Sequence, residues 1–219
     1  MKDNTRRQGR EDRISCDISQ EERRGMLILI SGPSGTGKGT LCDRLVSQDP
    51  RIKFSVSATT RKPREYEQDG IHYNFISEEA FDQLLIEDAL LEYATVHEHR
   101  YGTPRGPVEE ALRKGFDVLL DVDSQGAINV MKRIVDCVSI FILPPSFASL
   151  KLRLHTRNTD NEKEIRKRLL NARAEILKYV EYDYALINDD LESAYERLKA
   201  IVTAERMRTN RCHPLIPEI

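Results

Sequence analysis

The chain has 219 residues, 32% of them charged, and a net charge of −2 at pH 7. This length is typical of one domain with a substantial core, and the nearly neutral charge argues against nucleic acid as the main partner. There is no apolar run of the roughly 20 residues that a membrane span needs, no signal-like segment near Met1 and no Cys-x-x-Cys pair among the four cysteines, so we expect a cytoplasmic protein that neither contacts a membrane nor carries a zinc site.

The first 24 residues have few apolar side chains and many interspersed basic and acidic ones. Such a segment cannot bury enough surface to order itself, so we expect a disordered tail at 1–24. A basic arm for RNA and a targeting peptide are the alternatives, and the interspersed acids weaken both. We place the main domain at 25–208 and a second tail at 209–219.

A glycine-rich turn follows the first strand, which we predict at residues 26–31. Gly32, Gly37 and Lys38 fit G-x-x-x-x-G-K, the phosphate-binding loop. Its glycines let backbone N–H groups approach an anion, and the helix predicted at 39–47 adds positive potential at its N-terminus. Lys38 supplies a full charge. The predicted nucleotide-binding residues here are Gly32, Pro33, Ser34, Gly35, Thr36, Gly37, Lys38, Gly39 and Thr40.

The residue after the lysine departs from the common pattern. That position is normally Ser or Thr, whose hydroxyl ligates Mg²⁺, but here it is Gly39. We therefore assign no direct protein ligand to the metal. We expect the nucleotide phosphates, water molecules and a more distant acid to hold it.

Strands and helices alternate along most of the remaining chain. Further core strands are predicted at 53–57, 117–121, 138–143 and 184–187, and two of them are nearly continuously apolar, as in parallel strands covered on both faces. Helices are predicted at 78–87, 107–114, 125–133, 161–181 and 191–208. In the helix at 161–181 an apolar stripe runs from Ile165 to Val180. This alternation predicts a doubly wound α/β fold with a parallel five-stranded sheet, whose ligands bind beyond the carboxyl ends of the strands.

Residues 57–106 interrupt the alternation with a polar stretch rich in Tyr, Arg and Glu. Strand-like pieces occur at 71–76 and 90–96. We predict a small, mixed, substrate-binding insertion between the first and third core strands, which leaves 25–56 and 107–208 as the core.

Arginines and acids in and after this insertion are candidates for a second site. Arg61 and Arg64 lie three residues apart beside a proline, and two guanidinium groups are able to grip one phosphate. Glu92 is one acid in an apolar run, and Asp121 with Asp123 closes the third core strand. Taken singly, each has a plainer explanation as a charged loop or a solvated face. Their occurrence together with a phosphate loop favours a functional site.

Several separated motifs occur in an order that resembles the guanylate kinase family from about residue 26 to 205. They are the phosphate loop, Ser57 through Arg64, Gly70 with Tyr73, Arg100-Tyr101-Gly102, Leu120-Asp121-Val122-Asp123 with Gln125-Gly126, Phe141 through Ser146, and Asn188-Asp189-Asp190. The resemblance implies transfer of the γ-phosphoryl group of ATP to GMP, giving ADP and GDP in purine nucleotide metabolism. It also implies Mg²⁺ as the ion that accompanies ATP.

The resemblance further implies how GMP is bound. The family's ligands for the GMP phosphate correspond to Arg61, Arg64, Tyr73 and Tyr101, and its guanine-binding residues to Ser57, Glu92 and Thr103, with Asp121 nearby. An ionised carboxylate such as Glu92 only accepts hydrogen bonds, which suits the N1–H and N2 amine of guanine and not the bare N1 of adenine. A site of this kind can reject the wrong base by about 10⁴-fold.

A lid is expected at about 147–163, after Pro144-Pro145. By resemblance, Arg153, Arg157 and Arg168 embrace the triphosphate and the transferred group, although on the sequence alone they read as surface arginines. With Lys38 and Arg64 they form the predicted set of catalytic cations. Asn188 corresponds to a residue on the adenine side. Asp121 and Asp123 could organise either the water molecules of the metal or an arginine.

Two other functions stay open at this stage. The chain could phosphorylate another nucleoside monophosphate, against which Glu92, Ser57 and Thr103 argue. It could also be a guanylate-kinase-like protein-binding module without catalysis, but such modules usually have a degraded phosphate loop, and Lys38 is present here. The sequence leaves open whether the protein is a monomer or a homo-oligomer.

Overall fold

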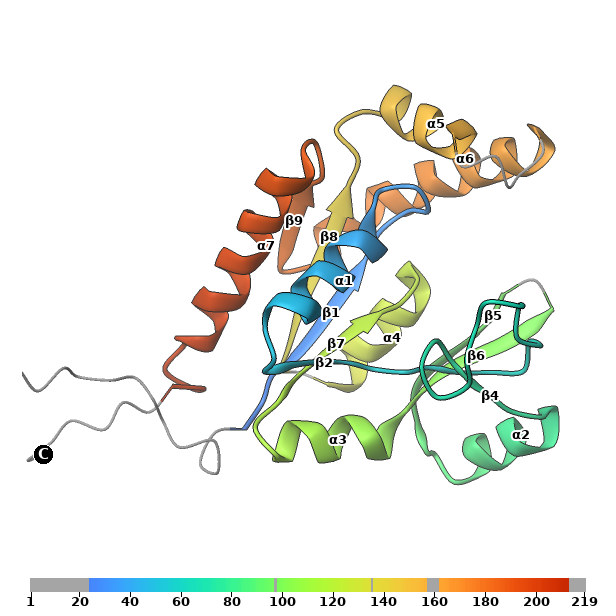
Figure 1. Ribbon diagram of the computed structural model, residues 1–219, viewed down its shortest axis with the longest axis vertical. Helices are drawn as coiled ribbons and strands as arrows, with labels where there is room; N and C mark the ends of the chain where they lie inside the picture. The colour runs from blue at the N-terminus through green and yellow to red at the C-terminus, as the bar shows by residue number, and fades with distance from the viewer. Residues whose placement is uncertain (1–23, 97, 135, 157–161, 213–219) are drawn as a thin grey trace, which may run out of the picture.

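The computed structural model describes residues 24–96, 98–134, 136–156 and 162–212 (Figure 1). Its centre is a five-stranded sheet with the order β2-β7-β1-β8-β9, and every neighbouring pair is parallel. The strands are β1 (Leu27–Ser31), β2 (Ile52–Phe54), β7 (Asp117–Asp121), β8 (Cys137–Leu143) and β9 (Tyr184–Ile187). The predicted α/β class and the five-stranded parallel sheet are therefore confirmed, although β2 is shorter than the strand predicted at 53–57.

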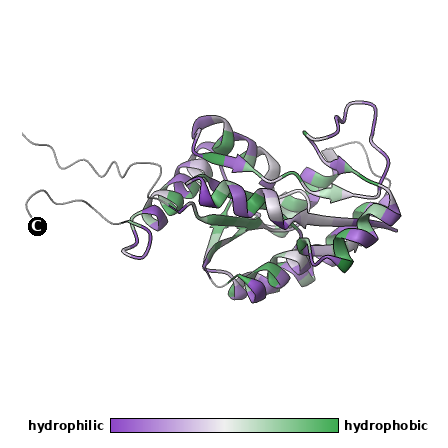
Figure 2. Cartoon of the chain, turned by 90° about the horizontal axis from the view of Figure 1, so that it is seen from below, coloured by the Kyte–Doolittle hydropathy of each residue, from purple (hydrophilic) through white to green (hydrophobic). Residues whose placement is uncertain are grey.

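Helices cover both faces of this sheet, which explains why its strands are apolar on both sides. Helices α1 (Lys38–Gln48) and α7 (Leu191–Arg206) pack on one face, and α3 (Arg105–Arg113) and α4 (Ser124–Arg133) pack on the other. Along β1 the side chains alternate, so that Ile28 and Ile30 belong to the first cluster and Leu27 and Leu29 to the second. Figure 2 shows the hydrophobic strands inside and hydrophilic residues on the outer helix faces.

The insertion forms a second sheet with the order β4-β3-β6-β5. Its elements are β3 (Ala58–Thr59), β4 (Asn74–Phe75), helix α2 (Glu78–Ile86), β5 (Leu90–Val96) and β6 (His99–Pro104). β3 and β4 are parallel and the other pairs antiparallel, so the sheet is mixed. The sequence predicted β5, but β4 is shorter than the predicted piece at 71–76, and β3 and β6 were not predicted because they are short or polar.

Two helices and a 3₁₀ turn stand next to the phosphate loop. They are α5 (Phe147–Thr156), α6 (Glu162–Ile176) and η1 (Leu177–Glu181), and α5 and α6 share a small apolar cluster around Leu150, Leu154, Ile165 and Ala172. The prediction of one helix over 161–181 was wrong at its end. The chain tightens to 3₁₀ geometry after Ile176, so the apolar stripe loses its register and Val180 is 69% exposed.

Charged side chains tie α7 and the residues that follow it to the segments just before the strands β2 and β8 and to the first residue of β7. Arg206 of α7 contacts the buried carboxylate of Asp117 and also Asp49, each at 2.6 Å. Beyond α7, Arg211 is buried and pairs with Glu205 and Asp136. In the described part of the chain, no helix is long and apolar enough to cross a membrane.

Candidate active site

The loop between β1 and α1 has a backbone that favours glycine, as two of its positions show most clearly. Gly32 has φ 146° and Gly37 has φ 84°. A Cβ at Gly32 would lie 2.4 Å from the Ile142 carbonyl oxygen, and one at Gly37 would lie 2.5 Å from Asn188 Nδ2. The buried hydroxyl of Thr36 donates to the Pro33 carbonyl at 2.9 Å. The glycines of the loop and the neighbouring Ile142 and Asn188 thus fix a backbone of the kind that a phosphate-binding loop requires.

Lys38 begins helix α1 and forms an ion pair with Asp121 at the carboxyl end of β7. Burial alone lowers the pKa of this lysine, but the Asp121 carboxylate outweighs it and raises the pKa above its ordinary value. Lys38 therefore stays charged. Asp121, predicted near the guanine, lies here against the phosphate loop.

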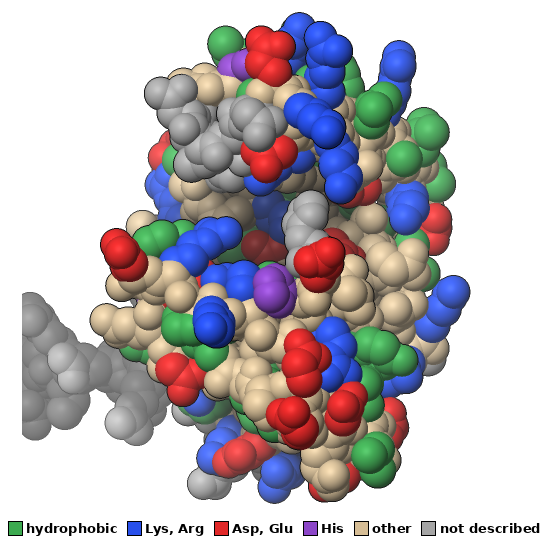
Figure 3. All heavy atoms as spheres, turned by 90° about the vertical axis from the view of Figure 1, so that its right-hand side faces the viewer, with side chains coloured by type: hydrophobic (Ala, Val, Ile, Leu, Met, Phe, Trp, Pro, Cys, Tyr) green, Lys and Arg blue, Asp and Glu red, His purple; other side chains and the backbone are tan. Residues whose placement is uncertain are grey.

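The loop borders a cavity of about 480 Å³. Its walls are Gly32 through Gly39, Tyr73 from the insertion, Asp121 to Asp123, and Glu175 from α6. Figure 3 shows this face of the molecule hollowed between the insertion and the two helices α5 and α6, which we call the lid helices. Lys and Arg side chains surround the hollow. Glu175 was not predicted, since nothing in the sequence distinguishes it from the other charged residues of its helix.

Two arginines of the lid helices donate hydrogen bonds to uncharged oxygen atoms in or beside the phosphate loop. Arg153 of α5 donates to the carbonyl oxygens of Thr36 (3.2 Å) and Asn188 (2.9 Å). Asn188 Nδ2 also donates to the Thr36 carbonyl, at 2.6 Å. Arg168 of α6 donates to the Ser34 hydroxyl at 3.2 Å. The structure thus brings Arg153, Arg168 and Asn188 together at the loop, while Arg157 lies outside the described residues.

In the insertion, an acid that the sequence analysis missed binds the first predicted arginine. Glu67 accepts two hydrogen bonds from the Arg61 guanidinium, at 2.8 and 2.9 Å, and a third from the Arg64 backbone N–H at 2.8 Å. The Arg61 guanidinium lowers the pKa of Glu67 to about 2. Arg61 Nε also donates to the Tyr101 hydroxyl at 3.3 Å. The short spacing of Glu67 from Arg64 was the available signal.

The remaining predicted phosphate ligands lie around Arg61 and Arg64. The guanidinium of Arg61 lies 5.5 Å from the centre of the Tyr73 ring, and the Tyr73 and Tyr101 rings meet edge to face. The exposed Arg64 donates to the Tyr66 hydroxyl at 3.0 Å. Arg61 and Arg64 thus have different side-chain partners, and no contact joins their two guanidinium groups in the described structure.

Glu92 and Thr103 form a buried pair on one face of the mixed sheet. Their residues face each other across β5 and β6, and the Thr103 hydroxyl donates to Glu92 Oε1 at 2.7 Å. Glu92 is 6% exposed and Thr103 is fully buried. Burial raises the pKa of Glu92, and the hydrogen bond from Thr103 partly offsets this. Ser57 is half-buried, and its backbone carbonyl accepts from the Asn74 N–H at 2.9 Å.

The oxygen atoms near the loop suit a hard cation such as Mg²⁺. Asp121, Asp123 and Glu175 place carboxylates on the wall of the cavity, whereas Gly39 offers no hydroxyl. Asp121 is paired with Lys38, and Asp123 caps α4 through the Gly126 N–H. Among the described residues, no group of three or more His, Cys, Asp or Glu side chains could hold a metal by itself.

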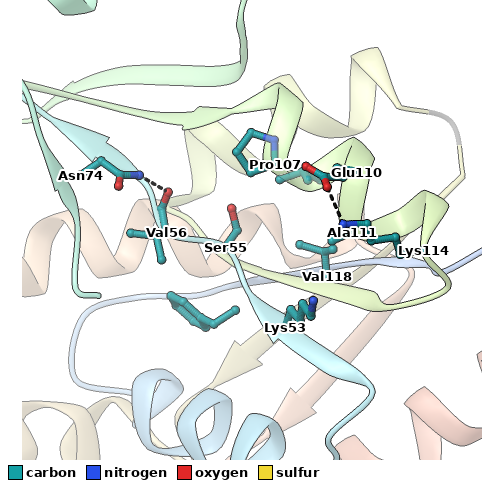
Figure 4. Close-up of a pocket in the computed structure, with 11 residues that line it drawn as sticks. Lys53, Ser55, Val56, Asn74, Pro107, Glu110, Ala111, Lys114 and Val118 are labelled. Carbon is teal, nitrogen blue, oxygen red and sulfur yellow. Dashed lines mark hydrogen bonds and ion pairs between the residues drawn. The ribbon is translucent and has the colours of Figure 1, made fainter. Parts of the chain in front are cut away.

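A second cavity, of about 400 Å³, lies beside the edge strand β2 and contains none of the predicted site residues. Figure 4 shows its walls, which come from β2 and the residues that follow it, from α3 as far as Lys114, from Val118 of β7 and from Asn74 of the insertion. Asn74 donates to the Val56 carbonyl, and Lys114 pairs with Glu110 on α3. This cavity contains neither the phosphate loop nor a predicted site residue, so it is not the candidate active site.

The sheet and the glycine loop define the class of this protein, which is a P-loop nucleotide-binding α/β protein. The family model for guanylate kinase matches residues 24–205. The chain is 50% identical over 192 residues to guanylate kinase of Agrobacterium fabrum (87% of each chain) and 47% identical over 191 residues to that of Desulfitobacterium hafniense (87% of this chain, 96% of the relative). The crystal structure of guanylate kinase from Anaplasma phagocytophilum superimposes with a TM-score of 0.70 at 34% identity, over 88% of this chain and 92% of the other. The chain belongs to the guanylate kinase family.

Proposed function

We propose that this chain transfers the γ-phosphoryl group of ATP to GMP, giving ADP and GDP. The observation that carries the proposal is the buried pair of Glu92 and Thr103 in the insertion of a P-loop protein. A buried carboxylate whose one fixed neighbour is a hydroxyl has acceptor sites left for donors on a base edge. Guanine offers two such donors, at N1 and N2, and adenine and the pyrimidines do not offer that pair.

The donor side of the proposed reaction is the phosphate loop with Lys38. Backbone N–H groups of the loop and the amino end of α1 would bind the phosphates of ATP, and Lys38 would exchange Asp121 for a phosphate oxygen. Asn188 and Arg153 support the proposal of an ATP site because they fix the Thr36 carbonyl and hence the loop. We assign the adenine side to the neighbourhood of Asn188.

The acceptor side is the cluster of Arg61, Arg64, Tyr73 and Tyr101, which we propose binds the phosphate of GMP. Arg61 is held by Glu67 and Tyr101, and within the described part of the chain its Nη2 donates one hydrogen bond, to Glu67, which leaves its second hydrogen for a ligand. Arg64 is exposed and has only a neutral side-chain hydrogen-bond partner, Tyr66. Arg64 is therefore better placed than Arg61 to contribute a two-pronged contact.

Catalysis in this proposal consists of positioning and charge stabilisation. The attacking group is an oxygen of the GMP phosphate, which needs no general base. Lys38, Arg64, Arg153, Arg157 and Arg168 supply positive charge, and Mg²⁺ bound with ATP neutralises charge on the transferred group. The lid and the insertion hold water out of the site, because water would otherwise accept the phosphoryl group. We expect the protein to act in the cytoplasm, where both nucleotides are available.

The experiment is an ADP-release assay with ATP, Mg²⁺ and each of GMP, AMP, CMP and UMP. We expect turnover with GMP to exceed turnover with each of the others by at least about 10³-fold in kcat/KM. Faster turnover with AMP, CMP or UMP would identify a kinase for another nucleotide. No ADP release with any of the four, from a protein that melts cooperatively, would favour a non-catalytic protein-binding module.

A further inference from the structure

The first turn of helix α4 lies against the carboxylate of Glu92. Asp123 caps the helix by accepting a hydrogen bond from the Gly126 N–H at 2.7 Å, so Gly126 lies in the first turn. A Cβ added at Gly126 would lie 2.7 Å from Glu92 Oε2 and 3.4 Å from Glu92 Cδ. The other carboxylate oxygen, Oε1, is held by the Thr103 hydroxyl at 2.7 Å. The Glu92 carboxylate thus sits between a hydroxyl on one side and the bare Cα of a glycine on the other.

We propose that Gly126 determines specificity for the base: its missing side chain leaves the room in which the Glu92 carboxylate is held. The inference rests on the proposed function, since it assumes that Glu92 reads guanine. It adds a residue that touches no substrate and acts through Glu92. Gly126 is in this sense a positioning residue for base recognition.

The backbone of α4 does not itself require glycine at this point. Gly126 is not among the residues with positive φ, and alanine is more favourable than glycine within a helix. Of the three atoms nearest to an added Cβ, two belong to Glu92, and the third, Asp123 Oδ1 at 3.4 Å, is an ordinary contact. The space that glycine leaves open is therefore space for Glu92.

A methyl group at this position should move Glu92 without unfolding the domain. The crowded atom is the end of a flexible side chain, which shifts more easily than backbone. Glu92 is only 6% exposed, however, and its carboxylate accepts a hydrogen bond from the Thr103 hydroxyl. A shift of the carboxylate therefore distorts that hydrogen bond. A displacement of about 1 Å at a recognition group can reduce the rate about 10²-fold.

The test compares Gly126→Ala with Gly106→Ala. Gly106 is also a glycine in the first turn of a helix, α3, and a Cβ there meets nothing within 4 Å. We expect Gly126→Ala to raise the KM for GMP about 10- to 100-fold, with the KM for ATP within twofold of wild type and a melting temperature that is not lower. We expect Gly106→Ala to change none of these.

Two further measurements separate recognition from a general structural effect. The first is the ratio of kcat/KM for GMP to kcat/KM for IMP, which lacks the N2 amine; this ratio should fall in Gly126→Ala because the carboxylate no longer meets that amine. The second is the same substitution in a Glu92→Asp background. The shorter acid withdraws from Gly126, so the effect of Gly126→Ala there should shrink to less than about threefold.

Three outcomes would overturn the inference. They are an unchanged KM for GMP, an equal rise in the KM for ATP, or a melting temperature several degrees lower, since each shows that the methyl group acts elsewhere than on Glu92. A wild-type protein that does not phosphorylate GMP would instead refute the proposed function. Activity of the wild type with GMP, combined with an indifferent Gly126→Ala, refutes this inference alone.

Discussion

Replacing the acid that is proposed to read guanine is the sharpest perturbation of this site. In Glu92→Gln the side chain keeps its length, but one acceptor oxygen becomes an NH₂ donor. An ionised Glu92 is able to accept from both N1–H and the N2 amine of guanine, and charge-assisted hydrogen bonds contribute about 1.5–3 kcal/mol each. Glutamine keeps at most one of these bonds and turns a donor toward a donor.

We therefore expect Glu92→Gln to lose about 3–4 kcal/mol of transition-state binding, which is about 10²- to 10³-fold in kcat/KM for GMP. The KM for ATP should stay within twofold, because the phosphate loop is a separate element. IMP, which lacks the N2 amine, should lose less than GMP. The assay is ADP release at saturating ATP with varied GMP or IMP.

The pH dependence of the same variant gives a second measurement. Burial raises the pKa of Glu92, so the folded protein binds this proton more tightly than the unfolded chain does. The ionised side chain therefore destabilises the fold, and this cost appears as the pH rises through the raised pKa. Glu92→Gln removes it, so the variant should be at least as stable as wild type at pH 7. In wild type, kcat/KM for GMP should fall as acid protonates Glu92.

A specific result would refute this reasoning. If Glu92→Gln loses less than threefold in kcat/KM for GMP while the KM for ATP is unchanged, the carboxylate does not contact the base. If the variant is also markedly less stable than wild type, Glu92 is a structural acid whose hydrogen bond with Thr103 holds the mixed sheet together.

Three further substitutions test other parts of the structure. Lys38→Ala should reduce kcat by about 10²-fold or more, as expected when a transition-state contact is removed; an activity within fivefold of wild type would contradict this. Glu67→Gln should raise the KM for GMP about tenfold by releasing Arg61, whereas Glu65→Gln on the same loop should have no effect; a lower KM would mean that Glu67 competes with the substrate phosphate. Asp117→Ala should cost about 3 kcal/mol of unfolding free energy in a denaturant titration, because it removes the buried acceptor of the Met26 N–H and one of the two carboxylates that hold Arg206, and both KM values should be unchanged; a loss below about 1 kcal/mol would show that Asp49 holds Arg206 without Asp117.

The central sheet was predictable because its apolar strand sequences are compatible with few other structures. Strands β1 and β8 are runs of buried apolar side chains, and such runs pack only where helices cover both faces. The phosphate loop was predictable for a different reason, since Gly32 and Gly37 adopt backbone conformations that other residues avoid. In both cases the local sequence excludes the alternatives.

The insertion was less predictable because long-range pairing decides its structure. β3 has two residues and β6 contains Gly102 and Pro104, so neither has the pattern of a strand on its own. β6 exists because it lies between β3 and β5. The position of Val180 was not predictable either. It belongs to an apolar stripe in the sequence, but it does not continue that stripe in the structure, because the chain tightens to 3₁₀ geometry.

The partners of the charged side chains could not be predicted from spacing at all. Spacing does not show that the Arg61 guanidinium pairs with Glu67 and the Arg64 guanidinium with Tyr66, and the expectation that both arginines bind one phosphate stays a prediction. Glu175 reaches the cavity only because α6 folds back over the phosphate loop. A sequence shows which cations are present, and the fold decides which acid each of them meets.

The pairing of some of these cations with carboxylates should determine which of them contribute most to nucleotide affinity. In the structure Lys38 pairs with Asp121, and Arg61 pairs with Glu67. A phosphate that replaces a carboxylate exchanges one charge-assisted contact for another, so the net gain is the difference between the two and not the whole strength of the new one. By contrast, Arg64 contacts a neutral hydroxyl and Arg153 contacts carbonyl oxygens, so each gains a full charge partner. Binding selectivity between phosphate groups should therefore depend more on Arg64 and Arg153 than on the two cations that already carry a carboxylate.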